Sequence, residues 1–316
     1  MQLKTLDLFC GGGGSGRGAS NAGAEIVCAI DAWNIAAETY KANFPDARVV
    51  NTKLDENSDI SILGKLGEIN LILASPECTN HTCAKGNRPR DENSKKTARY
   101  VLNFARTLKP RWLIIENVIQ MRRWHGYDPL IMELEGLGYH VSPEVLDASE
   151  FGVPQTRKRL FLLCDREKMP APVVRPVEQT VCTAEEVIQL DGPWQSRPLH
   201  TERRAKETIA RADRAIDALG KGKPFLIVYY GSDGSGGWQP LGRPLRTLTT
   251  LDRFGLVTWE DEAPMLRMLQ VPELKRAMGF DGLHDLPYGT RRDQIRILGN
   301  GVCPPVMEAV VRSLTQ

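Results

Sequence analysis

Asn70-Leu71-Ile72-Leu73-Ala74-Ser75-Pro76-Glu77-Cys78 is the stretch from which the fold of this chain can be worked out. Its apolar run has the length of a buried strand, and Pro76 ends that strand abruptly. Open α/β sheets bind their ligands at the carboxyl ends of parallel strands, so the pattern places Cys78 at such an end. The alternative is a small buried cysteine, which is the commoner arrangement for a single thiol.

The segment after this strand, Thr79–Arg99, is polar and strongly basic. A core cysteine has no need of such a neighbour, whereas a polyanionic substrate would be attracted to it. We therefore expect its cations to contact phosphate groups, in particular Lys85, Arg88, Lys95 and Lys96.

A second signal lies at the start of the chain, where Leu3–Cys10 has the pattern of a buried strand. The glycine-rich turn Gly11–Ala19 follows, and a strand over Glu25–Asp31 ends in an acid. This order lets backbone approach a nucleotide-like ligand, while the acid binds ribose hydroxyls. A merely flexible loop is the alternative, which the position of Asp31 disfavours. Because Arg17 is the one cation of the turn, the pattern leaves both a dinucleotide and S-adenosylmethionine open.

Two further strands bring polar side chains to their ends. The helix predicted over Thr97–Leu108 is followed by a strand at Arg111–Ile115, which ends at Glu116. Further on, Arg157 and Arg159 precede the strand Leu160–Cys164, and their spacing of two points both to one face of an extended segment. A glutamate that caps a helix and two solvated arginines are the alternatives.

The composition changes near residue 165, where prolines punctuate a stretch with little periodicity. A charged helix is predicted over Thr201–Leu219, and a solvated face is one explanation of its charges. A strand at Phe225–Tyr230 leads into the glycine-rich loop Gly231–Trp238. We also predict a last helix that begins at Pro304 or Pro305.

The bulk composition is that of an ordinary globular protein, with 316 residues and a net charge of +2, so any nucleic-acid surface must be a local patch. The seven cysteines lack paired metal-ligand spacing, which favours reduced thiols in a cytoplasmic protein and no metal site. We expect no signal peptide and no membrane-spanning segment.

Across almost its whole length, the chain resembles the cytosine-5 DNA methyltransferases of the Dcm-like, prokaryotic or phage type. Seven blocks occur in the order of that family: Asp7–Gly14, Asp31, Pro76-Glu77-Cys78, Glu116-Asn117-Val118, Gln155–Arg159, Arg243-Pro244 with Thr247 and Thr249, and Gly299–Val302. The resemblance implies an α/β fold, with a doubly wound, Rossmann-like large domain and a small, loop-rich target-recognition domain. The catalytic domain would cover residues 1–165 and be completed by residues 263–316, and the recognition domain would cover residues 166–262.

The resemblance also implies a role for each matching residue. Cys78 would add to carbon 6 of a cytosine flipped out of the duplex. Glu116 would hold the amino group and ring nitrogen 3, Arg159 the base oxygen, and Arg157 the loop that carries Cys78. The expected S-adenosylmethionine ligands are Phe9, Gly11, Gly13, Gly14, Asp31, Pro76, Asn300 and Val302. Trp238, Gln239 and Arg243 are expected to contact DNA, with Trp238 and Gln239 at base edges.

One block departs from the family, which normally has proline before the nucleophile and glutamine after it; here these residues are Glu77 and Thr79. An anion close to a thiol raises its pKa, so this change bears on the reaction rate. Two alternatives to an active DNA methyltransferase therefore stay open: an RNA cytosine-5 methyltransferase on the same scaffold, and a catalytically silent DNA-binding relative. Double-stranded DNA is the expected partner, a cognate restriction endonuclease is a candidate partner, and we expect a monomer.

Overall fold

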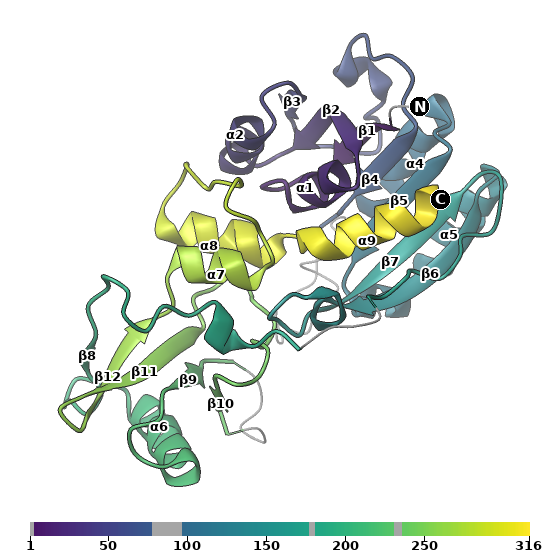
Figure 1. The fold of residues 1–316 in the computed structure, drawn as a ribbon. Coiled ribbons are helices and arrows are strands. Elements are labelled where there is room, and N and C mark those ends of the chain that lie inside the picture. Colours follow the sequence, from purple (N-terminus) through teal and green to yellow (C-terminus); the bar gives the residue numbers. More distant parts are fainter. Residues whose placement is uncertain (1–2, 78–96, 177–180, 231–235) are drawn as a thin grey trace.

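A seven-stranded sheet forms the centre of the larger part of the molecule, as the computed structural model shows for the residues it describes, 3–77, 97–176, 181–230 and 236–316 (Figure 1). The strand order is β3-β2-β1-β4-β5-β7-β6, in which the first five strands are parallel and β7 is antiparallel to both its neighbours. The strands are β1 (Leu3–Leu8), β2 (Ala24–Asp31), β3 (Arg48–Asn51), β4 (Leu71–Ala74), β5 (Trp112–Asn117), β6 (His140–Asp147) and β7 (Lys158–Asp165). The direction of winding reverses between β1 and β4, and such a switch point is where open α/β sheets bind ligands.

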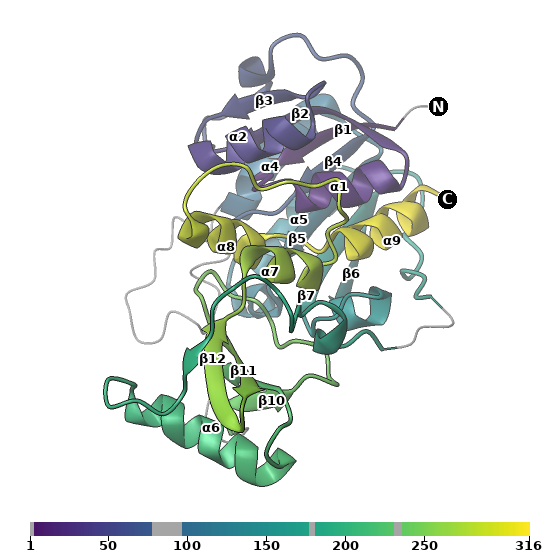
Figure 2. The same ribbon diagram turned by 60° about the vertical axis from the view of Figure 1, so that its left-hand side comes forward.

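Helices cover both faces of this sheet because the residues of β4 alternate between two cores. Leu71 and Leu73 belong to one core cluster, and Ile72 and Ala74 to the other. The first cluster includes side chains of α1 (Gly14–Asn21), α2 (Asn34–Asn43) and α9 (Pro304–Thr315). The second includes side chains of α4 (Thr97–Leu108) and α5 (Tyr127–Gly136). Figures 1 and 2 show α9 lying beside α1, although nearly the whole chain separates them.

A second sheet of five strands forms the smaller part, in the order β10-β9-β11-β12-β8 (Figure 2). Its strands are β8 (Arg197–Pro198), β9 (Phe225–Val228), β10 (Trp238–Pro240), β11 (Phe254–Glu260) and β12 (Ala263–Met268). Helix α6 (Lys206–Leu219) packs on one face of this sheet, where Ala212 and Ala215 lie in a cluster with Phe225 and Leu266. The antiparallel strands carry the apolar residues of this small core on alternate positions.

Short elements join the two sheets and complete the large part. These are α7 (Val271–Ala277), α8 (Arg291–Asn300) and the 3₁₀ turns η1 (Ile60–Leu63), η3 (Ile119–Arg123), η4 (Ala148–Phe151) and η5 (Ala184–Glu186). Both α7 and α8 begin with a capping box, formed by Gln270 with Glu273 and by Thr290 with Asp293. These reciprocal hydrogen bonds fix where each helix starts.

The predicted fold class, a doubly wound large domain with a smaller companion, is confirmed. Residues 267 and 268 belong to β12 and pair with β11 in the small sheet. Helix α7 then begins at Val271, where the Gln270 capping box and Pro272 favour a helix start. The small sheet therefore continues to Met268, past residue 262, where the sequence placed the end of that domain.

Within the described residues, no helix is long and apolar enough to cross a membrane. The same residues bring no three histidine, cysteine, aspartate or glutamate side chains together in a way that could hold a metal ion.

Candidate functional site

The ends of β1, β4 and β5 meet at the switch point, and hydrogen bonds join the segments that follow them. The amide of Ser75, just after β4, donates to the carbonyl of Leu8 at 3.1 Å. The side-chain amide of Asn117, at the end of β5, donates to the carbonyl of Pro76 at 3.2 Å. The chain that leads to Cys78 is thus fixed to both neighbouring strands. Cys78 itself and the predicted phosphate contacts Lys85, Arg88, Lys95 and Lys96 lie outside the described residues.

Glu116 and Arg159 form an ion pair at this edge of the sheet. The Nε atom of Arg159 lies 3.3 Å from Oε1 of Glu116, and Glu116 is only 6% exposed. The two residues come from the adjacent antiparallel strands β5 and β7, which explains why they meet although they are 43 positions apart in the sequence. Burial raises the pKa of the Glu116 carboxyl, and the nearby Arg159 and Arg157 guanidinium groups partly offset that rise.

Ser75 connects this ion pair to the glycine-rich turn. Its hydroxyl makes a hydrogen bond to the Glu116 carboxylate, which opposes the rise in the pKa of Glu116. The same hydroxyl oxygen lies 3.3 Å from Oγ of Ser15, in the first turn of α1. Sequence reasoning missed both serines. The sequence did contain a signal for Ser75. This residue directly follows a predicted strand, and two other predicted strands end in the polar residues Asp31 and Glu116.

Arg157 is a buried clamp between distant segments. One terminal nitrogen donates to the carbonyl of Leu248 at 2.9 Å, and the other donates to the carbonyls of Gly299 and Gly301, both at 2.8 Å. The preceding Gln155 also binds backbone, because its amide donates to the carbonyl of Ala277 and accepts from the amide of Leu248. This block therefore joins β7 to the segment before β11 and to the C-terminal segment. Its expected contact with the Cys78 loop involves residues outside the described part.

The glycine-rich turn needs glycine at the positions where α1 starts. Gly13 has φ +97°, which favours glycine, and it precedes the first residue of the helix. A Cβ atom on Gly14 would lie 2.2 Å from the carbonyl oxygen of Val302, so the two segments pack backbone to backbone. Asn300 ends α8 two residues before Val302. The fold thus brings together two blocks that the sequence placed at one cofactor site.

Asp31 lies at the end of β2 and binds the same turn. Its two carboxylate oxygens accept hydrogen bonds from the backbone amides of Gly11 and Trp33, each at 2.8 Å. Burial raises the pKa of Asp31, an effect that these amides oppose. A Cβ atom on Gly11 would meet nothing within 4 Å, so the backbone is open to a ligand there. Phe9, half-buried beside it, adds an aromatic ring. An acid, an open backbone and an aromatic side chain fit an adenosine-type cofactor.

Two buried polar groups lie behind this turn, and neither was given a role of its own from the sequence. Asp7 accepts a hydrogen bond from the Tyr40 hydroxyl at 3.0 Å, while its other oxygen has no hydrogen-bond partner in the described structure. Burial raises the pKa of Asp7 to about 7. His284 packs on Phe280 near Gly13, and burial together with the positive charge of Arg17 lowers its pKa to about 4. Asp7 belongs to the first of the seven blocks named above, whereas His284 lies outside all of them.

The residues expected to contact DNA from the small sheet differ in exposure. Arg243 is exposed, and Trp238 is half-buried in β10. Gln239 is only 4% exposed, and its amide donates to the carbonyl of Pro244 and accepts from the amide of Arg246, both at 3.2 Å. This geometry does not match the base-reading role expected of Gln239, because both ends of its amide already bind the backbone of its own turn.

Comparison with known proteins adds evidence of a different kind. A family model described as C-5 cytosine-specific DNA methylase matches residues 3–316. Among curated proteins, the chain is 32% identical over 257 residues to Type II methyltransferase M.HgiDI of Herpetosiphon aurantiacus, covering 78% of this chain and 80% of that protein. Other relatives match over less of their length, such as 42% of Type II methyltransferase M.AgeI of Thalassovita gelatinovora.

Similarity also reaches an RNA-modifying enzyme and a structure from a prophage. A tRNA (cytosine(38)-C(5))-methyltransferase of Mus musculus is 29% identical over 55% of this chain and 42% of its own length. The structure of a putative DNA modification methyltransferase encoded within an E. coli prophage aligns with a TM-score of 0.71 at 18% identity, covering 99% of both chains. At that identity, the structural likeness supports the fold alone.

Proposed function

The chain belongs to the family of C-5 cytosine-specific DNA methylases, and we propose that it methylates carbon 5 of a cytosine in duplex DNA. The methyl donor would be S-adenosylmethionine, and the cytosine would be flipped out of the duplex before reaction, since the edge and ring atoms concerned are not accessible in stacked DNA. The observation that carries the proposal is the buried Glu116–Arg159 pair at the switch point, linked through Ser75 to the glycine-rich turn.

Glu116 and Arg159 would bind the base. The raised pKa of Glu116 favours a protonated carboxyl, which can donate to ring nitrogen 3 while its carbonyl oxygen accepts from the amino group. The Arg159 guanidinium beside it would bind oxygen 2, where negative charge gathers when a nucleophile adds at carbon 6. Hydrogen bonds to a buried site of this kind would offset the cost of removing the base from the stack, about a few kcal/mol.

Cys78 would supply the nucleophile. Its thiolate would form a bond to carbon 6, which moves electron density to carbon 5 so that carbon 5 can accept a methyl group. Loss of the proton on carbon 5, followed by breakage of the sulfur–carbon bond, would release methylated cytosine and restore the thiolate. Pro76, which the Asn117 amide holds in place, fixes the backbone two residues before this cysteine.

The cofactor residues would be those around the glycine-rich turn. When bound, S-adenosylmethionine supplies a methyl group on a positively charged sulfur, which is a good leaving group. Asp31 would accept hydrogen bonds from ribose hydroxyls, Phe9 would contact the adenine, and the backbone of Gly11 would approach the ligand closely. The close packing of Gly14 against Val302 would form the back of this site.

An RNA substrate is a second candidate because a tRNA cytosine-5 methyltransferase is among the relatives. The five-stranded sheet and its helix would form the recognition part of this chain, and reading a duplex sequence would use such a surface. DNA is therefore the substrate that we propose, and the experiment includes RNA as a competing substrate.

The test measures transfer of a labelled methyl group to unmethylated genomic DNA and to unmodified tRNA in parallel, followed by base-resolution mapping of 5-methylcytosine. We expect methylation of DNA at a defined sequence. Covalent trapping on duplex DNA containing 5-fluorocytosine should be lost in Cys78→Ser and retained in the control Cys83→Ser. Methylation of tRNA alone, or trapping that survives in Cys78→Ser and disappears in Cys83→Ser, would contradict the proposal.

A further inference from the structure

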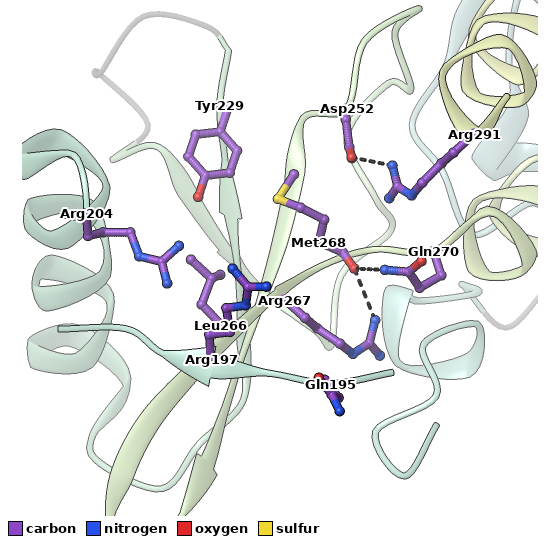
Figure 3. A pocket seen from close by; sticks show the side chains of 10 residues that line it. All are labelled: Gln195, Arg197, Arg204, Tyr229, Asp252, Leu266, Arg267, Met268, Gln270 and Arg291. Carbon is purple, nitrogen blue, oxygen red and sulfur yellow. Dashed lines mark hydrogen bonds and ion pairs between the residues drawn. The ribbon is translucent and has the colours of Figure 1, made fainter. Parts of the chain in front are cut away.

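The small sheet contains a cavity of about 340 Å³ beside the start of α8 (Figure 3). Arg197 of β8, Arg204 before α6 and Tyr229 after β9 line it, and the same three residues line a neighbouring cavity of about 730 Å³. Figure 3 shows the polar ends of these three side chains turned toward a common space. We call these three residues the arginine pocket.

The charges in and around the arginine pocket are not balanced. Two other arginines that line the 340 Å³ cavity have carboxylate partners. Arg267 pairs with the buried Glu273 at 2.8 Å, and Arg291 pairs with Asp252. In the described part of the chain, neither Arg197 nor Arg204 has a carboxylate within ion-pair distance. An exposed acid, Glu202, lines the neighbouring cavity and offsets only part of this charge.

Arg204 is held in place rather than free to move into solvent. Its Nε atom donates to the carbonyl of Leu199 at 3.3 Å, and a terminal nitrogen donates to the carbonyl of Pro198 at 3.0 Å. Both acceptors are uncharged, so the positive charge remains. Burial raises the pKa of Tyr229, which keeps its hydroxyl protonated and able to donate. Two guanidinium groups that have no ion-pair partner in the described structure, together with a hydroxyl that faces the same space, fit an oxyanion with several acceptors.

We propose that the arginine pocket binds one backbone phosphate of duplex DNA. The inference rests on the proposed function, which makes a phosphate of duplex DNA the oxyanion that this pocket would meet. Arginines also bind the backbone around Tyr229: Arg253 donates to its carbonyl at 3.0 Å, and Arg211 donates to the carbonyl of Val228 at 3.4 Å. The pocket is therefore fixed to the strand that leads toward the segment expected to read bases. A phosphate held there would set the position of the duplex without reading its sequence.

The test compares the salt dependence of DNA binding. Fluorescence anisotropy with a labelled non-cognate duplex and with a cognate duplex, at four KCl concentrations, gives the slope of log K against log salt. Arg197→Gln/Arg204→Gln should reduce the magnitude of that slope by about 0.9, the loss of one phosphate contact, and should weaken both duplexes alike. Arg197→Lys/Arg204→Lys keeps the charges and should keep most of the slope.

The matched control is Lys65→Gln/Arg106→Gln, which removes the same charge from exposed positions of the large domain. Its slope should equal that of the wild type. A wild-type slope in the glutamine pair would overturn the inference, as would a change seen with inorganic phosphate or RNA but not with DNA. A wild-type protein that neither binds nor methylates DNA would overturn the proposed function as well. Circular dichroism of each variant confirms that the fold is retained.

Discussion

The arginines of the large domain and those of the small sheet differ in what they bind. Arg159 pairs with Glu116, and Arg157 gives its terminal nitrogens to three backbone carbonyls. Arg197 and Arg204, by contrast, line a cavity without a carboxylate partner in the described structure. Arg157 and Arg159 bind groups of the protein itself, so they can stabilise the fold and orient a reacting group. Arg197 and Arg204 keep their charge available for a ligand.

This difference shows what residue type alone cannot say about function. Arg203 and Arg204 lie in a charged stretch that a solvated helix face would explain, whereas Arg157 and Arg159 follow a recognisable motif. The partners of each guanidinium group distinguish an arginine that joins backbone segments from one that is proposed to bind a base or a phosphate. Changes at each kind of position should therefore have effects of different kind and size.

Glu116→Gln should have the largest effect on activity. The amide keeps the shape of the carboxyl but has no acidic proton, so methyl transfer should fall by about 10²- to 10⁴-fold. The measurement is single-turnover methyl transfer with saturating cofactor, beside cofactor affinity by calorimetry, which should hardly change. Glu150→Gln, at an exposed glutamate paired with Arg175, is the control and should keep wild-type rates. Equal rates in both variants would remove Glu116 from the mechanism.

Arg157→Ala should have the largest effect on stability. It leaves the buried carbonyls of Leu248 and Gly299 and the half-buried carbonyl of Gly301 without this donor. A buried acceptor without a partner costs about 1–3 kcal/mol. Because neighbouring losses do not add fully, we expect a decrease of about 3–5 kcal/mol in the free energy of unfolding, measured by urea titration. Arg197→Ala, which removes an exposed arginine, should change it by less than about 0.5 kcal/mol. Similar losses in the two variants would show that the clamp and the pocket do not differ as described.

The pH dependence of stability gives a smaller effect, centred on Asp7. Its pKa is raised from 3.8 to about 7 in the folded protein, so the folded state binds more protons than the unfolded state between these values. Stability should therefore fall as pH rises from about 4 to 7 and then level off, by up to a few kcal/mol. Asp7→Asn should remove this fall, as measured by thermal unfolding at a series of pH values. A wild-type slope in Asp7→Asn would assign the pH dependence to another group.

The sequence could predict the strand ends of the large domain, because each apolar run of strand length stops at a polar residue. The alternation of Leu71 to Ala74 between two cores follows from the same pattern. The partners of Arg157 could not be predicted, since residues 248, 299 and 301 offer only backbone carbonyls, which every residue has. Gln239 illustrates the same limit: a polar side chain next to a glycine-rich loop gave no sign that its amide would bind its own turn.

The smallest effect expected is that of Ser75→Ala, which tests whether the link between the glycine-rich turn and Glu116 contributes to catalysis. The Ser75 hydroxyl stabilises the ionised form of Glu116, so its removal should raise the pKa of that carboxyl further. The inflection of the rate–pH profile that belongs to Glu116 should move to higher pH, whichever form of the carboxyl is active, while the rate at its optimum changes only several-fold. Ser15→Ala is the matched control, because the Ser15 hydroxyl lies 3.3 Å from the Ser75 hydroxyl and makes no hydrogen bond to Glu116 in the described structure. If Ser75 acts only on packing, both alanine variants should lower stability alike and leave the inflection unmoved. A shift in Ser75→Ala that is larger than the shift in Ser15→Ala would instead identify Ser75 as the residue that positions Glu116 for the base.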